Sequence, residues 1–353
     1  MREESLRRVL RRAVAVATGV FLVAAAHSAF AQATSGDKPA WLDPTLIAAA
    51  QKEGSVTVYS STNEEEGLPM WKIFEAATGI KVDYLRASDS QILSRVLIEN
   101  RAGERSWDVA YIGNVNKIPA ELRAPFEPSE ARNLIDAARD PDKRWYGVYA
   151  NYDAPAYNTN LVKPEALPAT YADFLQHPEW AGKIAIDGTD DAWLYAIFQQ
   201  FGPDAGRKLV TDIVTNLKPV VVDGHLAVAR GVGSGEYAVA LNNYVMLTLN
   251  VQLSGGPTDF WTMDPVALFF GQVGIAALAP HPNAARLAAN FAMSRDAQAY
   301  EARFGRLPTR PDVATNPPGV LDRINRHKVI NVLFDTEEDR SWSRQFTQLF
   351  KPR

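Results

Sequence analysis

Short strand-like runs and helical stretches alternate regularly over the first part of the chain that we expect to fold. Residues 55–59, 80–85 and 108–112 are rich in β-branched and aromatic side chains, which favour strands. Between them, apolar residues recur at helical spacing over residues 68–77 and 93–97. The first of these helices is expected to begin with solvated glutamates at residues 64–66 and to end at Gly79. This order is typical of a mostly parallel sheet that is covered by helices on both faces. The sequence therefore predicts an α/β fold.

The predicted sheet locates the first candidate ligand-binding loops. In open α/β sheets, ligands bind beyond the carboxyl ends of the strands. The loops that follow the three predicted strands are residues 60–63, 87–91 and 113–114. Their polar side chains are also good helix caps, so binding and capping both remain open as roles for Ser60 and Ser61.

An extended aromatic stretch over residues 145–157 is interpreted as the crossing into a second lobe. There, a strand over residues 182–186 precedes an acidic turn and a helix through Trp193. Two more strands are predicted over residues 220–222 and 236–241, and the chain is expected to return around residues 264–279. The size of the predicted mature chain, about 320 residues, also suggests two lobes rather than one hydrophobic core. We expect the first lobe to comprise residues 34–150 plus 272–325, and the second residues 151–271 plus 326–353.

The amino-terminal residues have the features of a cleavable signal peptide. Arginines between residues 7 and 12 precede an apolar run over residues 13–26, and the small-residue pattern of residues 29–31 is typical of a cleavage site. The apolar run is shorter than a membrane-spanning helix. We therefore expect residues 1–33 to direct export to the periplasm, by the general secretory or the twin-arginine route.

Composition excludes several classes of function. A net charge of −4 argues against nucleic acid as a partner, and the absence of cysteine excludes disulfides and thiol catalysis. The histidines are scattered without metal-ligand spacing, and we expect no cofactor. Residues 231–235 are rich in glycine but lack the spacing of a phosphate loop, so they are predicted to form a turn.

Short motifs along the chain resemble those of periplasmic solute-binding proteins of ABC importers, in the branch that includes ferric-ion, thiamine and polyamine binders. The motifs follow the order of that family over nearly the whole mature chain. They are VTVYSS (56–61), FEAATGIKV (74–82), WDV (107–109), YNTNLV (157–162), WAGKI (180–184), GEY (235–237), LNNY (241–244), PNAA (282–285) and SRDAQ (294–298).

The resemblance implies a two-lobed Venus-flytrap fold whose crossing strands form a hinge that closes on a small molecule. It also implies a monomer that carries no catalysis and delivers its ligand to an ABC permease and ATPase in the inner membrane.

The ligand is expected to differ from that of the ferric binders. Such proteins offer a histidine, a glutamate and two adjacent tyrosines at positions where this chain has Asn63, Gln91, Tyr244 and Val245. Of these four, only Tyr244 offers a hard anionic oxygen, whereas ferric iron favours several. Iron bound through atypical ligands, or through exogenous anions, stays the alternative.

The acidic turn of the second lobe favours a cationic or neutral organic ligand. Asp190 and Asp191 begin the predicted helix, where their charge disfavours a bound anion. As alternatives to ligand contacts, they can be simple helix-start acids, and the aromatic residues nearby can fill the core. The residues expected to contact the ligand are Ser60, Ser61, Asn63, Gln91, Tyr152, Asp190, Asp191, Trp193, Asn243 and Tyr244.

Two other classes of function stay open. One is a periplasmic enzyme on the same scaffold that uses Asp190 or Asp191 as an acid or base, although no nucleophile and base stand together in the sequence. The other is a binding protein that serves a chemoreceptor or sensor rather than a permease.

Overall fold

The computed structural model describes residues 38–350, so the predicted signal peptide lies outside the described residues. The chain separates into a unit of residues 1–39 and a unit of residues 40–353, and the fold lies in the second unit. None of the helices between residues 38 and 350 has the length and apolar character that crossing a membrane requires.

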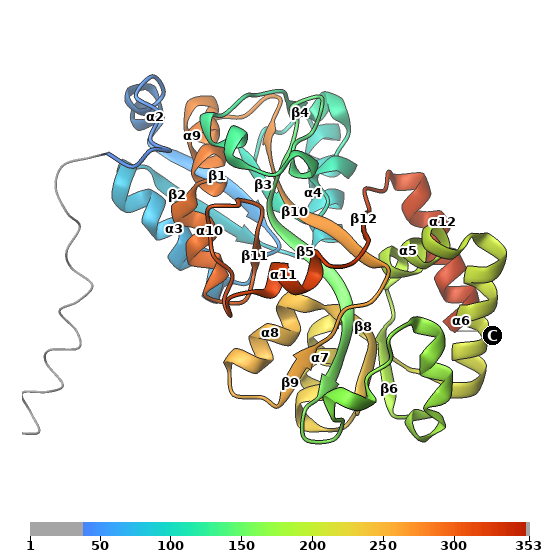
Figure 1. Cartoon of the computed structure of the whole chain (residues 1–353). Coiled ribbons are helices and arrows are strands. Elements are labelled where there is room, and N and C mark those ends of the chain that lie inside the picture. The colour runs from blue at the N-terminus through green and yellow to red at the C-terminus, as the bar shows by residue number, and fades with distance from the viewer. Residues whose placement is uncertain (1–37, 351–353) are drawn as a thin grey trace, which may run out of the picture. The chain divides into compact units, whose positions relative to one another are not determined.

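One mixed sheet runs through this unit in the order β2-β1-β3-β10-β5-β8-β6-β7 (Figure 1). Strands β2, β1 and β3 pair in parallel at one end, and β8, β6 and β7 do so at the other. This confirms the predicted strand–helix alternation. The main strands are β1 (Ser55–Ser60), β2 (Lys81–Arg86), β3 (Val109–Ile112), β5 (Tyr146–Asn158), β6 (Ile184–Asp187), β7 (Val220–Val222), β8 (Val239–Tyr244) and β10 (Val266–Ala276).

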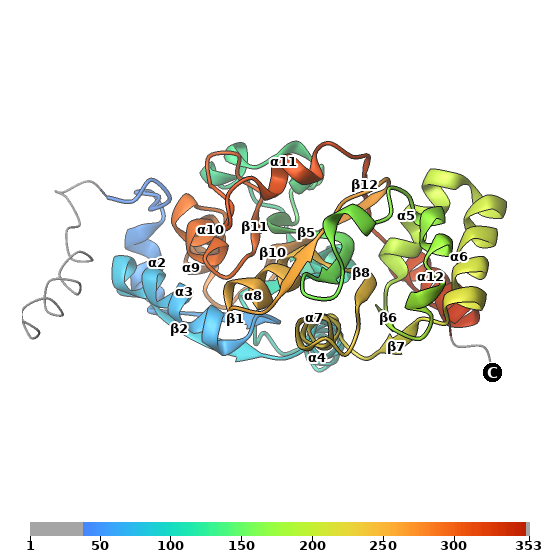
Figure 2. The ribbon, with the colours of Figure 1, turned by 60° about the horizontal axis from the view of Figure 1, so that its bottom comes forward.

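Strands β5 and β10 are antiparallel and connect the two parallel ends of the sheet (Figure 2). All of β5 is buried, which explains its aromatic and small side chains. The expected lobe boundaries, at residues 150/151 and 271/272, fall within these strands, and they stay a prediction. The shorter strands are β4 (Arg123–Ala124), β9 (Thr258–Phe260), β11 (Leu307–Pro308) and β12 (Val329–Asn331).

Helices cover both ends of the sheet (Figure 1). Glycine ends α3 as the sequence predicts, because Gly79 adopts a left-handed conformation with φ of 72°. Short 3₁₀ helices such as η1 (Val115–Lys117) lie in the connections. The α-helices are α2 (Ile47–Glu53), α3 (Glu64–Thr78), α4 (Asp89–Arg101), α5 (Asp191–Phe201), α6 (Pro203–Leu217), α7 (His225–Ser234), α8 (Val245–Leu253), α9 (Pro282–Ala292), α10 (Arg295–Ala302), α11 (Val320–Ile324) and α12 (Thr336–Phe350).

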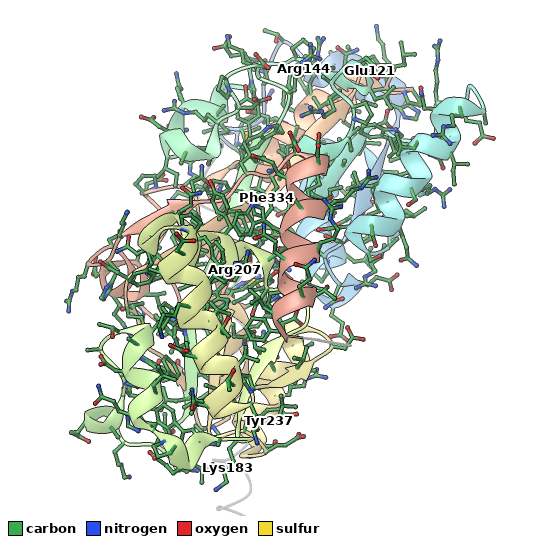
Figure 3. All side chains as sticks on the ribbon, turned by 90° about the vertical axis from the view of Figure 1, so that its right-hand side faces the viewer. Glu121, Arg144, Lys183, Arg207, Tyr237 and Phe334 are labelled. Atoms are coloured by element: carbon green, nitrogen blue, oxygen red, sulfur yellow. The ribbon has the colours of Figure 1, made fainter. Side chains whose placement is uncertain are left out.

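Two large hydrophobic cores flank the crossing strands. The first includes Trp71, Phe74 and Phe291, and the second includes Trp193 and Phe346. Helix α12 belongs to the second core and packs on α5 and α6. Figure 3 shows Phe334, just before α12, and Arg207 of α6, whose Nη2 donates a hydrogen bond to Gln345 Oε1 at 3.3 Å.

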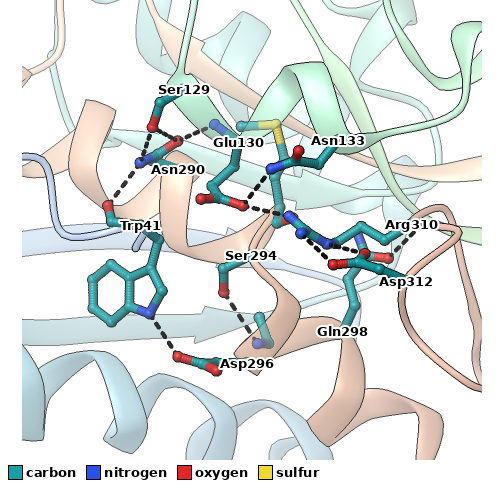
Figure 4. A network of polar contacts seen from close by, with 12 residues as sticks. Trp41, Ser129, Glu130, Asn133, Asn290, Ser294, Asp296, Gln298, Arg310 and Asp312 are labelled. Atoms are coloured by element: carbon teal, nitrogen blue, oxygen red, sulfur yellow. Dashed lines mark hydrogen bonds and ion pairs between the residues drawn. The ribbon is translucent and has the colours of Figure 1, made fainter. Parts of the chain in front are cut away.

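A buried polar network holds the β3 end of the fold together around Asn290 of α9 (Figure 4). Its Nδ2 donates to the Trp41 carbonyl at 2.7 Å, and its Oδ1 accepts from the Glu130 N–H at 3.0 Å. Arg310 pairs with Glu130 and with Asp312. These contacts join three segments that are far apart in the sequence.

Three local predictions are corrected by the structure. Residues 231–234 are the last turn of α7 rather than a separate turn, and only Gly235 has left-handed φ, at 82°. Strand β8 begins at Val239, three residues later than the predicted residue 236. Glu66, expected to be solvated, accepts hydrogen bonds from buried Arg306 at 2.7 and 2.9 Å.

Candidate functional site

A cavity of about 160 Å³ opens where loops from both ends of the sheet meet β5 and β10. Its lining contains five aspartates and one basic residue, Lys117. We call the lining residues that follow β2 and β3 the β3 wall: Asp89, Gly113, Asn114, Asn116 and Lys117. We call those on the opposite side the β6 wall: Asp153, Thr189, Asp190, Asp191, Ala192 and Tyr244. Phe269, Gln272, Val332, Leu333, Phe334 and Asp339 complete the lining.

Asp153 and Asp190 lie at the bottom of the β6 wall with 0% and 1% of their surface exposed. Both oxygens of Asp153 and Oδ2 of Asp190 have no hydrogen-bond partner, while Asn242 Nδ2 donates to Asp190 Oδ1 at 3.2 Å. Burial raises the pKa of both carboxyl groups well above the ordinary range. Buried carboxylates are normally paired, so these two need a proton or a bound cation.

His225 of α7 does not supply that positive charge. Its Nε2 lies 3.5 Å from Oδ1 of both Asp187 and Asp190, and its ring stacks on Tyr244 at 3.5 Å between centroids. Burial lowers the pKa of this imidazole to about 4. The neutral ring therefore supplies no positive charge to the two carboxyl groups at neutral pH.

Asp187 has a structural role beneath the same wall. Its Oδ1 accepts from the Thr189 N–H and its Oδ2 from the Gly224 N–H, both at 2.7 Å. These bonds hold the turn between β6 and α5, so Asp190 and Asp191 reach the cavity.

The carboxy-terminal segment forms the outer part of the cavity. Ser343 Oγ of α12 donates to Asp191 Oδ2 at 2.7 Å, and burial raises the pKa of Asp191 to about 6. Lys117 forms an ion pair with Asp339 of α12, so the basic residue of the lining is already engaged. Asn116 Nδ2 donates to the Phe334 carbonyl at 2.8 Å.

The structure brings together Asp190, Asp191 and Tyr244 of the residues expected from the sequence to contact a ligand. Tyr152 is buried in the first core, because strand side chains alternate and its neighbour Asp153 is the one that lines the cavity. Trp193 lies in the second core, with its ring 5.7 Å from that of Tyr171.

The other expected contacts do not line the cavity. Asn243 is fully buried and its Oδ1 lies 3.2 Å from His225 Nδ1. Ser60 accepts a hydrogen bond from the Thr62 N–H, and the Ser61 N–H donates to the Tyr111 carbonyl. Exposed Asn63 accepts from Arg86, and exposed Gln91 forms a capping box with Ser88.

Sequence reasoning missed three of the five aspartates that line the cavity: Asp89, Asp153 and Asp339. The usable signal for Asp153 is that it is the single charged residue of a strand rich in aromatic and small side chains, since buried charges need a partner. Asp89 falls inside one of the predicted loops, residues 87–91. Tyr244 stays the one hard anionic donor among the four positions compared with ferric binders, but five carboxylates from other positions also line the cavity.

Despite this acidity, the carboxylates are not arranged as a metal site. Among residues 38–350, no three histidine or acidic side chains converge closely enough to hold one metal ion. The cavity instead offers separate oxygen acceptors on opposite walls.

Proteins that are similar to this chain in sequence or in structure are iron-uptake proteins and substrate-binding proteins. Iron uptake protein A1 of Synechocystis sp. is 24% identical over 273 residues, which are 71% of this chain and 74% of that protein. The structure of iron-bound HitA from Pseudomonas aeruginosa matches with a TM-score of 0.70 and 20% identity, over 83% of this chain and 99% of that one. The substrate-binding protein of an ABC transporter from Agrobacterium tumefaciens matches with a TM-score of 0.71 and 17% identity, over 84% and 94% of the two chains.

These matches confirm the predicted two-lobed α/β binding-protein fold. The relatives are transport proteins rather than enzymes, in agreement with the sequence-based prediction. Residues 122–333 match the sequence model of a family described as bacterial extracellular solute-binding protein. The chain belongs to this family of bacterial extracellular solute-binding proteins.

Proposed function

We propose that this protein captures a small organic cation in the cavity between its β3 and β6 walls and delivers it to the permease of an ABC importer. One observation carries the proposal: Asp153 and Asp190 are fully buried beside the cavity, and three of their four carboxylate oxygens have no partner. The periplasm, reached through a cleaved signal peptide, is the compartment that this role requires.

The physical argument is the cost of burying charge without compensation. Removing an ion from water costs several kcal/mol, and this cost is recovered only when an opposite charge and hydrogen bonds replace the lost solvent. Lys117, the basic residue of the lining, is paired with Asp339. A cationic ligand would supply the missing charge.

The size and walls of the cavity also suit such a ligand. A cavity of about 150 Å³ holds one benzene molecule, so about 160 Å³ suits a compound of roughly five to eight non-hydrogen atoms. Tyr244 and Phe269 line the cavity with their ring centroids 5.1 Å apart in an edge-to-face arrangement. Their rings can attract a cation through its interaction with π electrons.

Ferric iron is the second candidate, because the names of the relatives refer to iron. The cavity has the hard oxygen donors that iron prefers. However, they do not converge on one point in this structure, and bound anions would have to complete the coordination. The organic cation is therefore the better supported ligand.

A thermal-shift screen of the mature chain, from residue 34 onward and without added metal, tests the proposal. The panel contains small primary and quaternary amines, thiamine, amino acids, sugars, organic acids and ferric citrate. We expect small amines to raise the melting temperature by several degrees, because only the folded state binds them. Stabilisation by ferric citrate but not by amines would replace this proposal with iron binding.

Asp153→Asn is the decisive variant, because it removes one charge while keeping the shape of the side chain. We expect it to abolish stabilisation by amines and to leave the unliganded melting temperature unchanged or higher. The matched control is Asp204→Asn, which makes the same change at an exposed position in the first turn of α6. An equal loss of amine binding in both variants would show that only the net charge matters.

A further inference from the structure

The β3 wall also presents oxygen atoms that lack a partner. Asp89 accepts the Gly113 N–H with Oδ2 at 3.2 Å, but its buried Oδ1 has no hydrogen-bond partner. The buried Oδ1 of Asn114 is also without a partner. Both residues line the cavity opposite Asp153 and Asp190.

Every buried side-chain atom that lines this cavity and lacks a partner is therefore an acceptor. Two donors of the lining are engaged elsewhere: Asn116 Nδ2 donates to the Phe334 carbonyl, and Lys117 pairs with Asp339. An acceptor left unpaired in a buried site costs free energy until a donor reaches it. The unpartnered atoms are Asp89 Oδ1, Asn114 Oδ1, Asp153 Oδ1 and Oδ2, and Asp190 Oδ2.

We infer that the ligand carries hydrogen-bond donors at both ends: a cationic nitrogen at Asp153 and Asp190, and a second N–H or O–H group at Asp89 and Asn114. This inference rests on the proposed function and makes Asp89 and Asn114 its specificity-determining residues. A small amino alcohol is the simplest compound of this class.

The same arrangement excludes ligands with a negative end. A carboxylate or phosphate at the β3 wall would face the carboxylate of Asp89, so charge repulsion would oppose its binding. The cavity is therefore expected to reject zwitterionic amino acids of the size that it otherwise accepts.

Three probes of similar size separate these effects. 3-Aminopropan-1-ol and butan-1-amine have the same charge and the same number of non-hydrogen atoms, but only the first has a donor at its far end. We expect calorimetry to show that the amino alcohol binds at least tenfold more tightly, as expected for a hydrogen bond to charged and buried acceptors. β-Alanine, which ends in a carboxylate, is expected to show no binding.

Variants of the β3 wall test whether Asp89 and Asn114 cause the preference for the amino alcohol over butan-1-amine. In Asp89→Ala and Asn114→Ala, the ratio of the two amine affinities should fall towards one, whereas Asn116→Ala should keep it because Asn116 Nδ2 already serves the Phe334 carbonyl. The ratio is measured within each variant, so a general loss of stability or affinity cancels.

The outcomes separate this inference from the proposed function. Equal binding of both amines by the natural sequence, or an unchanged ratio in both β3-wall variants, would overturn the inference while amine capture stands. Binding of neither amine would overturn both.

Discussion

Asp153 of β5 and Tyr244 of β8 are register partners, so a buried carboxylate stands directly beside a phenol ring on the β6 wall. Burial and the surrounding aspartates raise the pKa of Tyr244 well above its ordinary value, and the phenol is neutral. A neutral phenol does not compensate the charge of a carboxylate. The missing positive charge therefore has to come from outside the protein, as a proton or as a ligand.

Binding of a cation should accordingly release protons. The raised pKa values of Asp153 and Asp190 mean that the empty site holds a proton, which a cationic ligand displaces. We expect affinity to rise with pH, by up to about tenfold per pH unit, until the pair is ionised. Calorimetry in two buffers with different ionisation enthalpies measures the protons released. The charged or titratable groups facing the pair are Asp187, Asp191, His225, Tyr244 and Tyr171.

The ligand-free protein should lose stability as Asp191 ionises. In the folded protein the pKa of Asp191 is about 6, above its ordinary value of 3.8. The stability that the protonated carboxyl group contributes is therefore complete below about pH 4 and is lost as pH rises through 6. Over that window, we expect a loss of up to about 3 kcal/mol in the free energy of unfolding. Urea unfolding at several pH values measures it.

Comparison with the Asp191→Asn variant isolates the contribution of Asp191 to the pH dependence of the free energy of unfolding. His225 acts in the opposite sense, because its folded pKa of about 4 lies below the ordinary 6.5, and it destabilises the fold as pH falls between those values. Both proteins share that contribution, so their difference reports Asp191 alone. A difference that does not vary between pH 4 and 7 would contradict the assignment.

Trp193 should affect stability and not recognition. It is 1% exposed, and its ring lies 6.2 Å from that of Phe350 in the second core. We expect Trp193→Ala to lower the free energy of unfolding by about 3–5 kcal/mol, as for other buried aromatic residues. Amine affinity, measured at low temperature where the variant is folded, should change less than threefold. A large loss of affinity would instead support the sequence-based role of Trp193 as a wall of the site.

Arg306 should be essential to the β3 end of the fold. Its guanidinium is bound by Glu66, lies 3.9 Å from Glu301 and sits 4.4 Å from the centre of the Tyr149 ring. Burial raises the pKa of Glu301 to about 7, and the neighbouring Arg306 counteracts this rise. We expect Arg306→Met to cost about 3–5 kcal/mol, because it leaves buried acids without their cation. Chemical unfolding at pH 8, where Glu301 is ionised, checks the value.

The sequence predicts elements better than it predicts which side chains reach the cavity. Period-2 and period-3.6 patterns locate β1, α3 and β5, and two of the three predicted loops supply Asp89 and Asn114. Helix α7 was not predicted, because Gly231 and Gly233 lower the helix propensity of its sequence. The Tyr237 ring packs so closely against Gly231 that a Cβ there would lie 2.5 Å from it, which explains the glycine.

The contacts of the site depend on register and tertiary packing, which a single sequence does not show. A shift of one residue along β5 separates Tyr152, in the core, from Asp153, in the cavity. In the same way, nothing near Asp191 in the sequence indicates that Ser343, 152 residues later, donates a hydrogen bond to it.

The cavity takes its lining from residues as far apart as Asp89 and Asp339. Residue 339 must therefore be in place before the lining is complete. An amino-terminal fragment that stops before α12 has an incomplete cavity. During synthesis from the amino terminus, the lining of the cavity is thus completed only when α12 docks on α5 and α6. The order of the sequence therefore makes completion of the cavity a late step of folding.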